Sequence, residues 1–313
     1  MSHSEWYRAS APGKFVILGE HAVVYGKPAI VLAVDLRMTI SVRGSRFNTI
    51  NSERIDFRRQ PHLRYLTRNV SSGLEFETES QIPVGSGLGS SAALSAALAL
   101  ALSEKEGRHM TENDLVEEAY GAELYAQGIG SPMDASACVH GGGIAVNLPE
   151  CEGRHLWTVT RGERTWSVSD VDVPDMTFVI GNTGIKAPTG PLVSKVKRYL
   201  DRSSFAADIV DDIEQTTLQG NQAIAKGDVE ELGRLMTEDH KLLSILGVSS
   251  NELNKLVNAS LPYSYGAKLT GAGGGGCMVA LTDEPEKVCE AIRSRGGTPY
   301  VVRTGVPGAM LHP

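Results

Sequence analysis

The chain has 313 residues, and its 30 Lys and Arg against 37 Asp and Glu give a formal net charge of −7. It contains no basic run interleaved with aromatic residues, which argues against nucleic acid as a partner. Its longest apolar run, 92–102, is shorter than the about 20 residues that span a bilayer, and residues 1–10 contain no signal-peptide core. We therefore expect a cytoplasmic protein with no membrane partner. Four scattered cysteines form no C-x-x-C pair, so neither a zinc site nor a disulfide framework is expected.

Short β-branched runs separated by Gly and Pro predict strands near the N-terminus, at 15–18, 29–33 and 38–42, with further strand and loop over 44–80. Later strands are expected at 144–147, 176–180, 277–281 and 298–303. Helices are expected over 90–106, 111–127, 191–202, 205–226, 228–246, 251–261 and 284–294. This order of elements favours an α+β fold. The polar stretch 150–175 indicates a boundary region, so we predict an N-terminal domain over 1–172 and a C-terminal domain over 173–313.

The segment Gln81-Ile-Pro-Val-Gly-Ser-Gly-Leu-Gly-Ser-Ser-Ala-Ala93 places three alternate glycines and two serines at the start of a helix. Glycines let the backbone approach a ligand closely, and the free amides at a helix N-terminus stabilise an anion. The spacing G-x-G-x-G-S-S matches neither the dinucleotide pattern nor the Walker pattern, which requires a Lys. A phosphate bound here would need a metal ion and a cation from elsewhere in the chain. Ser90 and Ser91 could bind that metal or could cap the helix.

The segment 11–26, Ala-Pro-Gly-Lys-Phe-Val-Ile-Leu-Gly-Glu-His-Ala-Val-Val-Tyr-Gly, keeps Lys14, Glu20 and His21 within an apolar stretch. Burying an uncompensated charge costs several kcal/mol, so a functional site explains these residues better than folding does. A solvated hairpin turn is the alternative.

Two further motifs lie downstream. Glu123 and Asp134 flank the loop 128–133, an arrangement that suits one carboxylate to metal binding and the other to accepting a proton, although either could be a surface charge or a helix cap. The glycine run 271–276 follows Lys268 and is either a flexible hairpin or a second wall of a phosphate site.

Together, the four motifs, which in chain order extend over nearly the whole chain, resemble the GHMP family of small-molecule kinases, which includes galactokinase, homoserine kinase, mevalonate kinase and phosphomevalonate kinase. The motif at 11–26 is similar to the mevalonate kinase branch. Sugar kinases carry an Asp shortly after Glu-His, whereas this chain has Ala22-Val-Val24 at that place. The segment 240–249 is similar to the same branch.

The resemblance implies a ribosomal-protein-S5-like N-terminal domain and a ferredoxin-like C-terminal domain. It further implies an ATP- and Mg²⁺-dependent enzyme that phosphorylates the C5 hydroxyl of mevalonate. The alternatives are a phosphomevalonate kinase and a catalytically silent nucleotide-binding sensor. Because relatives are often dimers, a homodimer is a further expectation.

Carried over by position, the resemblance implies that Lys14 bridges the γ-phosphate and the catalytic base Asp134, while Ser91 and Glu123 hold Mg²⁺. Glu20, His21, Thr183 and Thr189 would line or approach the substrate. Ser131 is also placed at the substrate site, although this chain reads Gly130-Ser-Pro-Met-Asp134 where many relatives read Pro-Ser-Gly-x-Asp. The loop around the ATP phosphates would consist of Pro83, Val84, Gly85, Ser86, Gly87, Leu88, Gly89, Ser90, Ser91 and Ala92.

Overall fold

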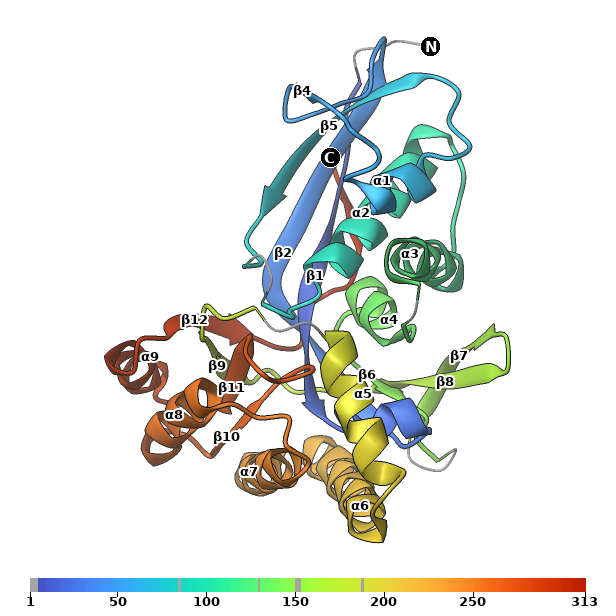
Figure 1. Cartoon of the computed structure of the whole chain (residues 1–313). Coiled ribbons are helices and arrows are strands. Elements are labelled where there is room, and N and C mark those ends of the chain that lie inside the picture. The colour runs from blue at the N-terminus through green and yellow to red at the C-terminus, as the bar shows by residue number, and fades with distance from the viewer. Residues whose placement is uncertain (1–4, 84–85, 129, 150–152, 187–188) are drawn as a thin grey trace.

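The computed structural model of the protein describes residues 5–83, 86–128, 130–149, 153–186 and 189–313, and these residues form two β-sheets (Figure 1). The nine strands of the larger sheet run in the order β4-β3-β5-β2-β6-β8-β7, with β1 paired to β2 and to β13. They are β1 (Tyr7–Leu18), β2 (Ala29–Ser45), β3 (Thr49–Ile50), β4 (Glu53–Arg54), β5 (Gly73–Ser80), β6 (Gly143–Val146), β7 (Arg154–Arg161), β8 (Arg164–Val171) and β13 (Met310–His312).

Helices cover this sheet in two layers: α2 (Ser90–Lys105) and α4 (Met133–His140) pack on β1 and β2, and α1 (Pro61–Leu66) and α3 (Glu112–Gln127) lie outside them. The small alanine side chains of α2 let it sit close to the sheet on one side and to α3 on the other, which explains why it is apolar on nearly all sides. The predicted start of α3 is confirmed by a capping box between Thr111 and Asp114.

The smaller sheet has the order β10-β11-β9-β12 and is antiparallel throughout its described ladders. Along the chain its elements alternate as strand, helices, two strands, helix and strand, which with this strand order is the ferredoxin-like arrangement. Its strands are β9 (Thr177–Asn182), β10 (Gly266–Leu269), β11 (Cys277–Leu281) and β12 (Thr298–Arg303). Its helices are α5 (Thr189–Leu200), α6 (Ser204–Lys226), α7 (Val229–Ile245), α8 (Asn251–Ser260) and α9 (Pro285–Ser294). The predicted α+β class is confirmed.

The two halves of the fold share apolar packing. One core cluster draws residues from both sheets, and the rings of Phe15 in β1 and Phe178 in β9 meet edge to face with centroids 5.0 Å apart. The chain also returns at its end, because β13 pairs with β1 in the larger sheet. The boundary placed between residues 172 and 173 stays a prediction; it falls between the end of β8 and the start of β9.

One sequence prediction about the larger sheet was wrong. The strands expected at 29–33 and 38–42 are one continuous strand, β2, because Arg37 stays extended and donates hydrogen bonds to Ser10 and to the carbonyls of Pro307 and Gly308. The stretch 150–175 contains the hairpin of β7 and β8, whose Trp157, Val159, Trp166 and Val168 are buried. The polar residues that indicated a boundary region include the exposed positions of that hairpin.

Candidate active site

Lys14 lies in the middle of β1, where a charged side chain would be costly without partners. It is only 4% exposed, and its Nζ lies 2.9 Å from Asp134 Oδ1 and 3.2 Å from the carbonyl oxygen of Gly87. Asp134 stands in the first turn of α4, and its side chain is 40% exposed. A buried ammonium thus holds a partly exposed carboxylate at the start of a helix, and the fold brings these two predicted residues together.

The loop 83–92, called the phosphate loop below, contacts β1 next to this pair. The backbone N–H of Lys14 donates to the carbonyl of Leu88 at 3.0 Å, and Leu88 itself is buried. The Ser86 hydroxyl donates to the carbonyl of Pro83, which closes the loop on itself. Val84 and Gly85 lie outside the described residues. The loop therefore presents the N-terminus of α2 beside the Lys14 ammonium, an arrangement suited to an anion.

The helix-capping alternative for Ser90 and Ser91 is wrong. Helix α2 begins at Ser90, its N-cap residue is Gly89 with φ +76°, and among the described residues no side chain caps this helix end. In the part of the chain that the structure describes, neither serine hydroxyl has a hydrogen-bond partner, and both serines are partly exposed. Both hydroxyls are therefore free to bind a metal ion or a phosphate.

Glu123, on α3, has the properties of a cation ligand. Its Oε2 accepts a hydrogen bond from Gln127 at 2.7 Å, whereas its buried Oε1 makes no hydrogen bond. The Oε1 atom lies 3.0 Å from His62 Nε2, but the two atoms are not aligned as donor and acceptor. A buried carboxylate oxygen without a donor is satisfied by a cation, so Glu123 fits the predicted role. His62 was not predicted, because a lone histidine in a polar segment carries no signal of a site.

No group of three His, Cys, Asp or Glu side chains in the described ranges is arranged to hold a metal ion. Mg²⁺ is commonly held by one or two protein oxygens together with phosphate and water oxygens.

His21 follows the end of β1 and has a strained backbone, with φ 61° and ψ −43°. Its Nε2 lies 2.9 Å from the carbonyl oxygen of Ala272, and since a carbonyl only accepts, Nε2 carries the proton. Burial lowers the pKa of His21, so its imidazole is neutral near pH 7. The Nδ1 atom then has a free lone pair, for which the described residues offer no donor.

Glu20, which the family resemblance assigns to the substrate, is turned inward. Its side chain is 2% exposed, and one carboxylate oxygen accepts a short hydrogen bond from Lys268, which is fully buried. Asp239 on α7 completes the group, with Oδ2 3.2 Å from Lys268 Nζ. Direct contact of Glu20 with a substrate therefore has no geometric support in this structure, and neither Lys268 nor Asp239 was recognised from the sequence as its partner.

The glycine run 271–276 forms a wall of the same region. Its Ala272 holds His21, and a Cβ added at Gly276 would lie 3.6 Å from the carbonyl oxygen of Ser86 in the phosphate loop. The hydroxyl and the backbone N–H of Thr183 both donate to the Gly276 carbonyl, at 2.8 and 2.9 Å. Of the two alternatives for this run, the second wall of the site fits better than a free hairpin.

Two of the predicted substrate residues gain no further support. Ser131 is half-buried in the loop before α4, and none of the hydrogen bonds found among the described residues involves it. The side chain of Thr189 lies outside the described residues. The roles of Thr183, Thr189 and Ser131 toward a substrate stay predictions.

Comparison with known proteins places this geometry in a family. Residues 59–142 match the GHMP kinases N terminal domain, and residues 221–298 match the GHMP kinases C terminal domain. The mevalonate kinase of Pyrococcus furiosus is 33% identical to the chain, with 97% of each chain covered.

Solved structures agree on the fold. The L. major mevalonate kinase in complex with R-mevalonate has a TM-score of 0.83 at 22% identity, covering 94% of both chains. The phosphomevalonate kinase of Streptococcus pneumoniae has a TM-score of 0.76 at 18% identity, covering 96% of this chain and all of the other. At these identities the structures show the fold alone, whereas the archaeal relative shows the family. The chain belongs to the GHMP kinase family and, within it, to the mevalonate kinases.

Proposed function

We propose that the chain transfers the γ-phosphate of ATP to the C5 hydroxyl of mevalonate, in a reaction that requires Mg²⁺. The observation that carries the proposal is the contact of the Lys14–Asp134 pair with the phosphate loop, in a chain that belongs to the mevalonate kinases. The reaction product would be 5-phosphomevalonate, a precursor for isoprenoid synthesis.

Asp134 is the proposed proton acceptor. One of its oxygens lies 2.9 Å from the Lys14 ammonium, and its partial exposure leaves room for a substrate hydroxyl to reach the carboxylate. Lys14 lies between this carboxylate and the loop carbonyl of Gly87, so the same ammonium can offset charge that develops on the transferred phosphoryl group.

The phosphates would bind to the amides at the start of α2, with the metal at Ser91 and Glu123. When bound, Mg²⁺ neutralises phosphate charge and helps to orient the transferred group. The chain itself contributes the positions of these groups. They are the N-terminus of α2, the buried Lys14 ammonium and the Glu123 carboxylate, whose Oε2 already accepts a hydrogen bond from Gln127.

His21 is a proposed substrate-binding residue. Its neutral imidazole has Nε2 committed to Ala272, so Nδ1 can accept a hydrogen bond from an alcohol. Apolar Ala22 and Val23 follow it and are buried. This combination suits a small molecule with few hydroxyls better than a sugar, because each buried hydroxyl without a partner costs roughly 1–3 kcal/mol.

The experiment that tests the function is ADP release from ATP and Mg²⁺ with mevalonate, phosphomevalonate, homoserine and galactose, each compared with the Asp134→Asn variant as the control for background hydrolysis. We expect mevalonate to be preferred by orders of magnitude. Phosphomevalonate as the better acceptor would replace the substrate but keep the chemistry of Lys14 and Asp134. ATP binding without turnover of any alcohol would favour the nucleotide-binding sensor instead.

Location and assembly stay predictions. None of the helices in the described ranges combines the length and the apolar character needed to cross a membrane. We expect the chain to be cytoplasmic and to form a homodimer, and native mass spectrometry of the purified protein would test the second point.

A further inference from the structure

A fully buried charged cluster lies outside the proposed chemistry. It consists of Lys268, Glu20 and Asp239, with side-chain exposures of 0%, 2% and 0%. The Lys268 ammonium contacts the carboxylates of Glu20 and Asp239 and donates a hydrogen bond to the carbonyl of Leu269, the last at 2.9 Å. The three residues come from the turn after β1, from α7 and from β10, so the cluster joins the two halves of the fold.

The cluster is a costly way to stabilise a protein. Removing charges from water carries a large penalty, and replacing a buried ion cluster with apolar residues is often neutral or stabilising. Here Glu20 Oε2 and both Asp239 oxygens make no hydrogen bond, so the carboxylates are only partly satisfied. Burial raises the pKa of both Glu20 and Asp239, and the Lys268 ammonium partly offsets that rise. Stability alone does not explain this arrangement.

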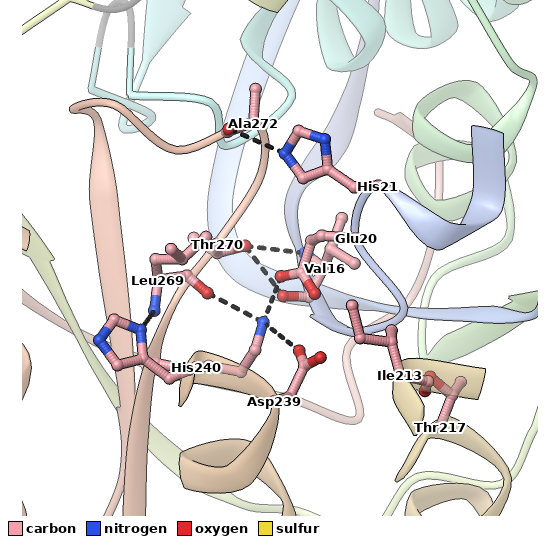
Figure 2. Close-up of polar contacts among 11 residues, drawn as sticks. Val16, Glu20, His21, Ile213, Thr217, Asp239, His240, Leu269, Thr270 and Ala272 are labelled. Atoms are coloured by element: carbon pink, nitrogen blue, oxygen red, sulfur yellow. Dashed lines mark hydrogen bonds and ion pairs between the residues drawn. The ribbon is translucent and has the colours of Figure 1, made fainter. Parts of the chain in front are cut away.

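The position of the cluster suggests what it does. Glu20 is the residue directly before His21, whose φ of 61° is costly for a residue with a Cβ. Such a conformation persists only where its surroundings fix it on both sides. The Ala272 carbonyl holds the His21 side chain, and Lys268 holds the Glu20 side chain. Lys268 and Ala272 belong to one segment of the chain, in which Lys268 lies four residues before Ala272. Between them, Thr270 bonds both the N–H and the carbonyl of Val16 in β1, at 3.1 and 2.9 Å, which fixes this segment against the strand (Figure 2).

We propose that Lys268 is a positioning residue for substrate binding: through Glu20 it holds the Glu20–His21 turn in its strained conformation and so keeps the His21 imidazole in place against Ala272. The consequence for the substrate rests on the proposed function, whereas the effect on His21 does not. Loss of the cluster releases the turn, and the alcohol loses its hydrogen-bond acceptor while the phosphate loop is left intact.

The test uses a neutral version of the cluster, Lys268→Met with Glu20→Gln and Asp239→Asn, so that no buried charge is left unpaired. The matched control is Lys27→Met. Lys27 follows the same turn and also sits between two carboxylates, Glu214 at 2.6 Å and Asp211 at 2.8 Å, but it lies nearer the surface and away from Glu20.

The first measurement needs no substrate. In protein labelled with ¹³C at histidine Cε1, the His21 cross-peak is assigned by its absence from the His21→Ala protein. We expect it to shift or broaden in the triple variant and to stay in place in Lys27→Met. An unmoved cross-peak in the triple variant, or an equal change in both variants, would overturn the positioning role whatever the substrate is.

The second measurement separates positioning from general loosening. In the triple variant we expect the KM for mevalonate to rise roughly tenfold or more, with the KM for ATP within about threefold of its original value. Equal rises in both KM values would refute the proposal. If the panel of alcohols identifies another substrate, the same comparison is made with that alcohol, so failure of the proposed function remains distinct from failure of this inference.

A pair of single variants covers the case in which the triple variant does not fold. Glu20→Gln keeps an oxygen that accepts from Lys268, whereas Glu20→Leu removes it at similar volume. We expect the His21 cross-peak and the KM for mevalonate to change far more in Glu20→Leu than in Glu20→Gln. Equal behaviour of the two would contradict the role of the Lys268 contact.

Discussion

Gly89 offers the sharpest test of how the phosphate loop positions Lys14. A Cβ added at Gly89 would lie 2.8 Å from Lys14 Cγ and 2.9 Å from Lys14 Cε, distances at which one of the two residues must move. The Lys14 side chain has little freedom to give way, because it is 5% exposed and its ammonium is held by Asp134 and by the Gly87 carbonyl. Gly89→Ala is therefore expected to displace the lysine from its partner.

The expected loss has two parts. Alanine at φ +76° costs about 1–2 kcal/mol of stability, because a left-handed backbone is strained for a residue with a Cβ. Displacement of the ammonium by about 1 Å from its productive position lowers turnover on the order of 10²-fold. The first effect appears in the free energy of unfolding, and the second appears in kcat at saturating ATP.

Gly87→Ala is the matched control. Gly87 has nearly the same φ, +78°, lies in the same loop, and has open space where its Cβ would stand. It should lose a similar amount of stability but keep kcat within a few-fold, although its KM for ATP is free to rise. The two variants are compared by urea unfolding and by ADP release with saturating ATP and mevalonate. Equal kcat values for the two would refute the argument that Gly89 is needed for Lys14.

Three further predictions concern the remaining groups. Asp134→Asn should bind ATP normally but lower kcat by on the order of 10²–10⁴-fold. Adding Lys14→Met to this variant should lower kcat much less than the two single losses together predict, because the pair acts as a unit. Near-normal turnover of either single variant in steady-state assays would contradict this. Glu123→Gln and Ser91→Ala should each raise the Mg²⁺ concentration needed for half-maximal activity, since a hard cation loses an oxygen ligand, and an unchanged Mg²⁺ titration would remove that residue from the metal site. Burial, with a smaller contribution from Lys268, lowers the pKa of His240 from its usual 6.5 to about 4, so the fold favours the neutral imidazole and stability should fall as the pH drops from about 6.5 toward 4. His240→Asn should flatten that dependence in urea titrations at several pH values, and an equally steep dependence would show that other groups cause it.

Secondary structure could be predicted from the sequence where a local pattern of residues has only one structural explanation. Helix α3 was predicted over 111–127 and begins at a capping box, and α2 was predicted directly after the glycines and serines of 85–91, because such signals act within a few residues. The hairpin of β7 and β8 was missed for the opposite reason: its Trp157 and Trp166 become informative only once the helices that cover them are placed. Tertiary packing, and not local propensity, decides such strands.

The same limit applies to the site. The Lys14–Asp134 pair was predicted from the family resemblance, and the fold brings the two side chains to 2.9 Å. The contact between Glu123 and His62 was not predicted, because it depends on how α1 and α3 pack. Likewise nothing local to Glu20 shows that its partner is Lys268, which lies 248 residues away along the chain.

Exposure is what separates the two buried lysines of this protein. Lys14 and Lys268 both belong to glycine-containing motifs and both pair with a carboxylate, so their sequence signatures are alike. The Asp134 partner of Lys14 is 40% exposed, which allows a substrate hydroxyl to reach the charged oxygen, whereas the Glu20 partner of Lys268 is 2% exposed and meets only protein. A carboxylate that accepts a proton from a substrate must be accessible, and one that fixes a turn is more effective when water cannot compete for its hydrogen bonds. Burial of the acidic partner, more than burial of the lysine, therefore distinguishes the pair suited to chemistry from the pair suited to holding the site in shape.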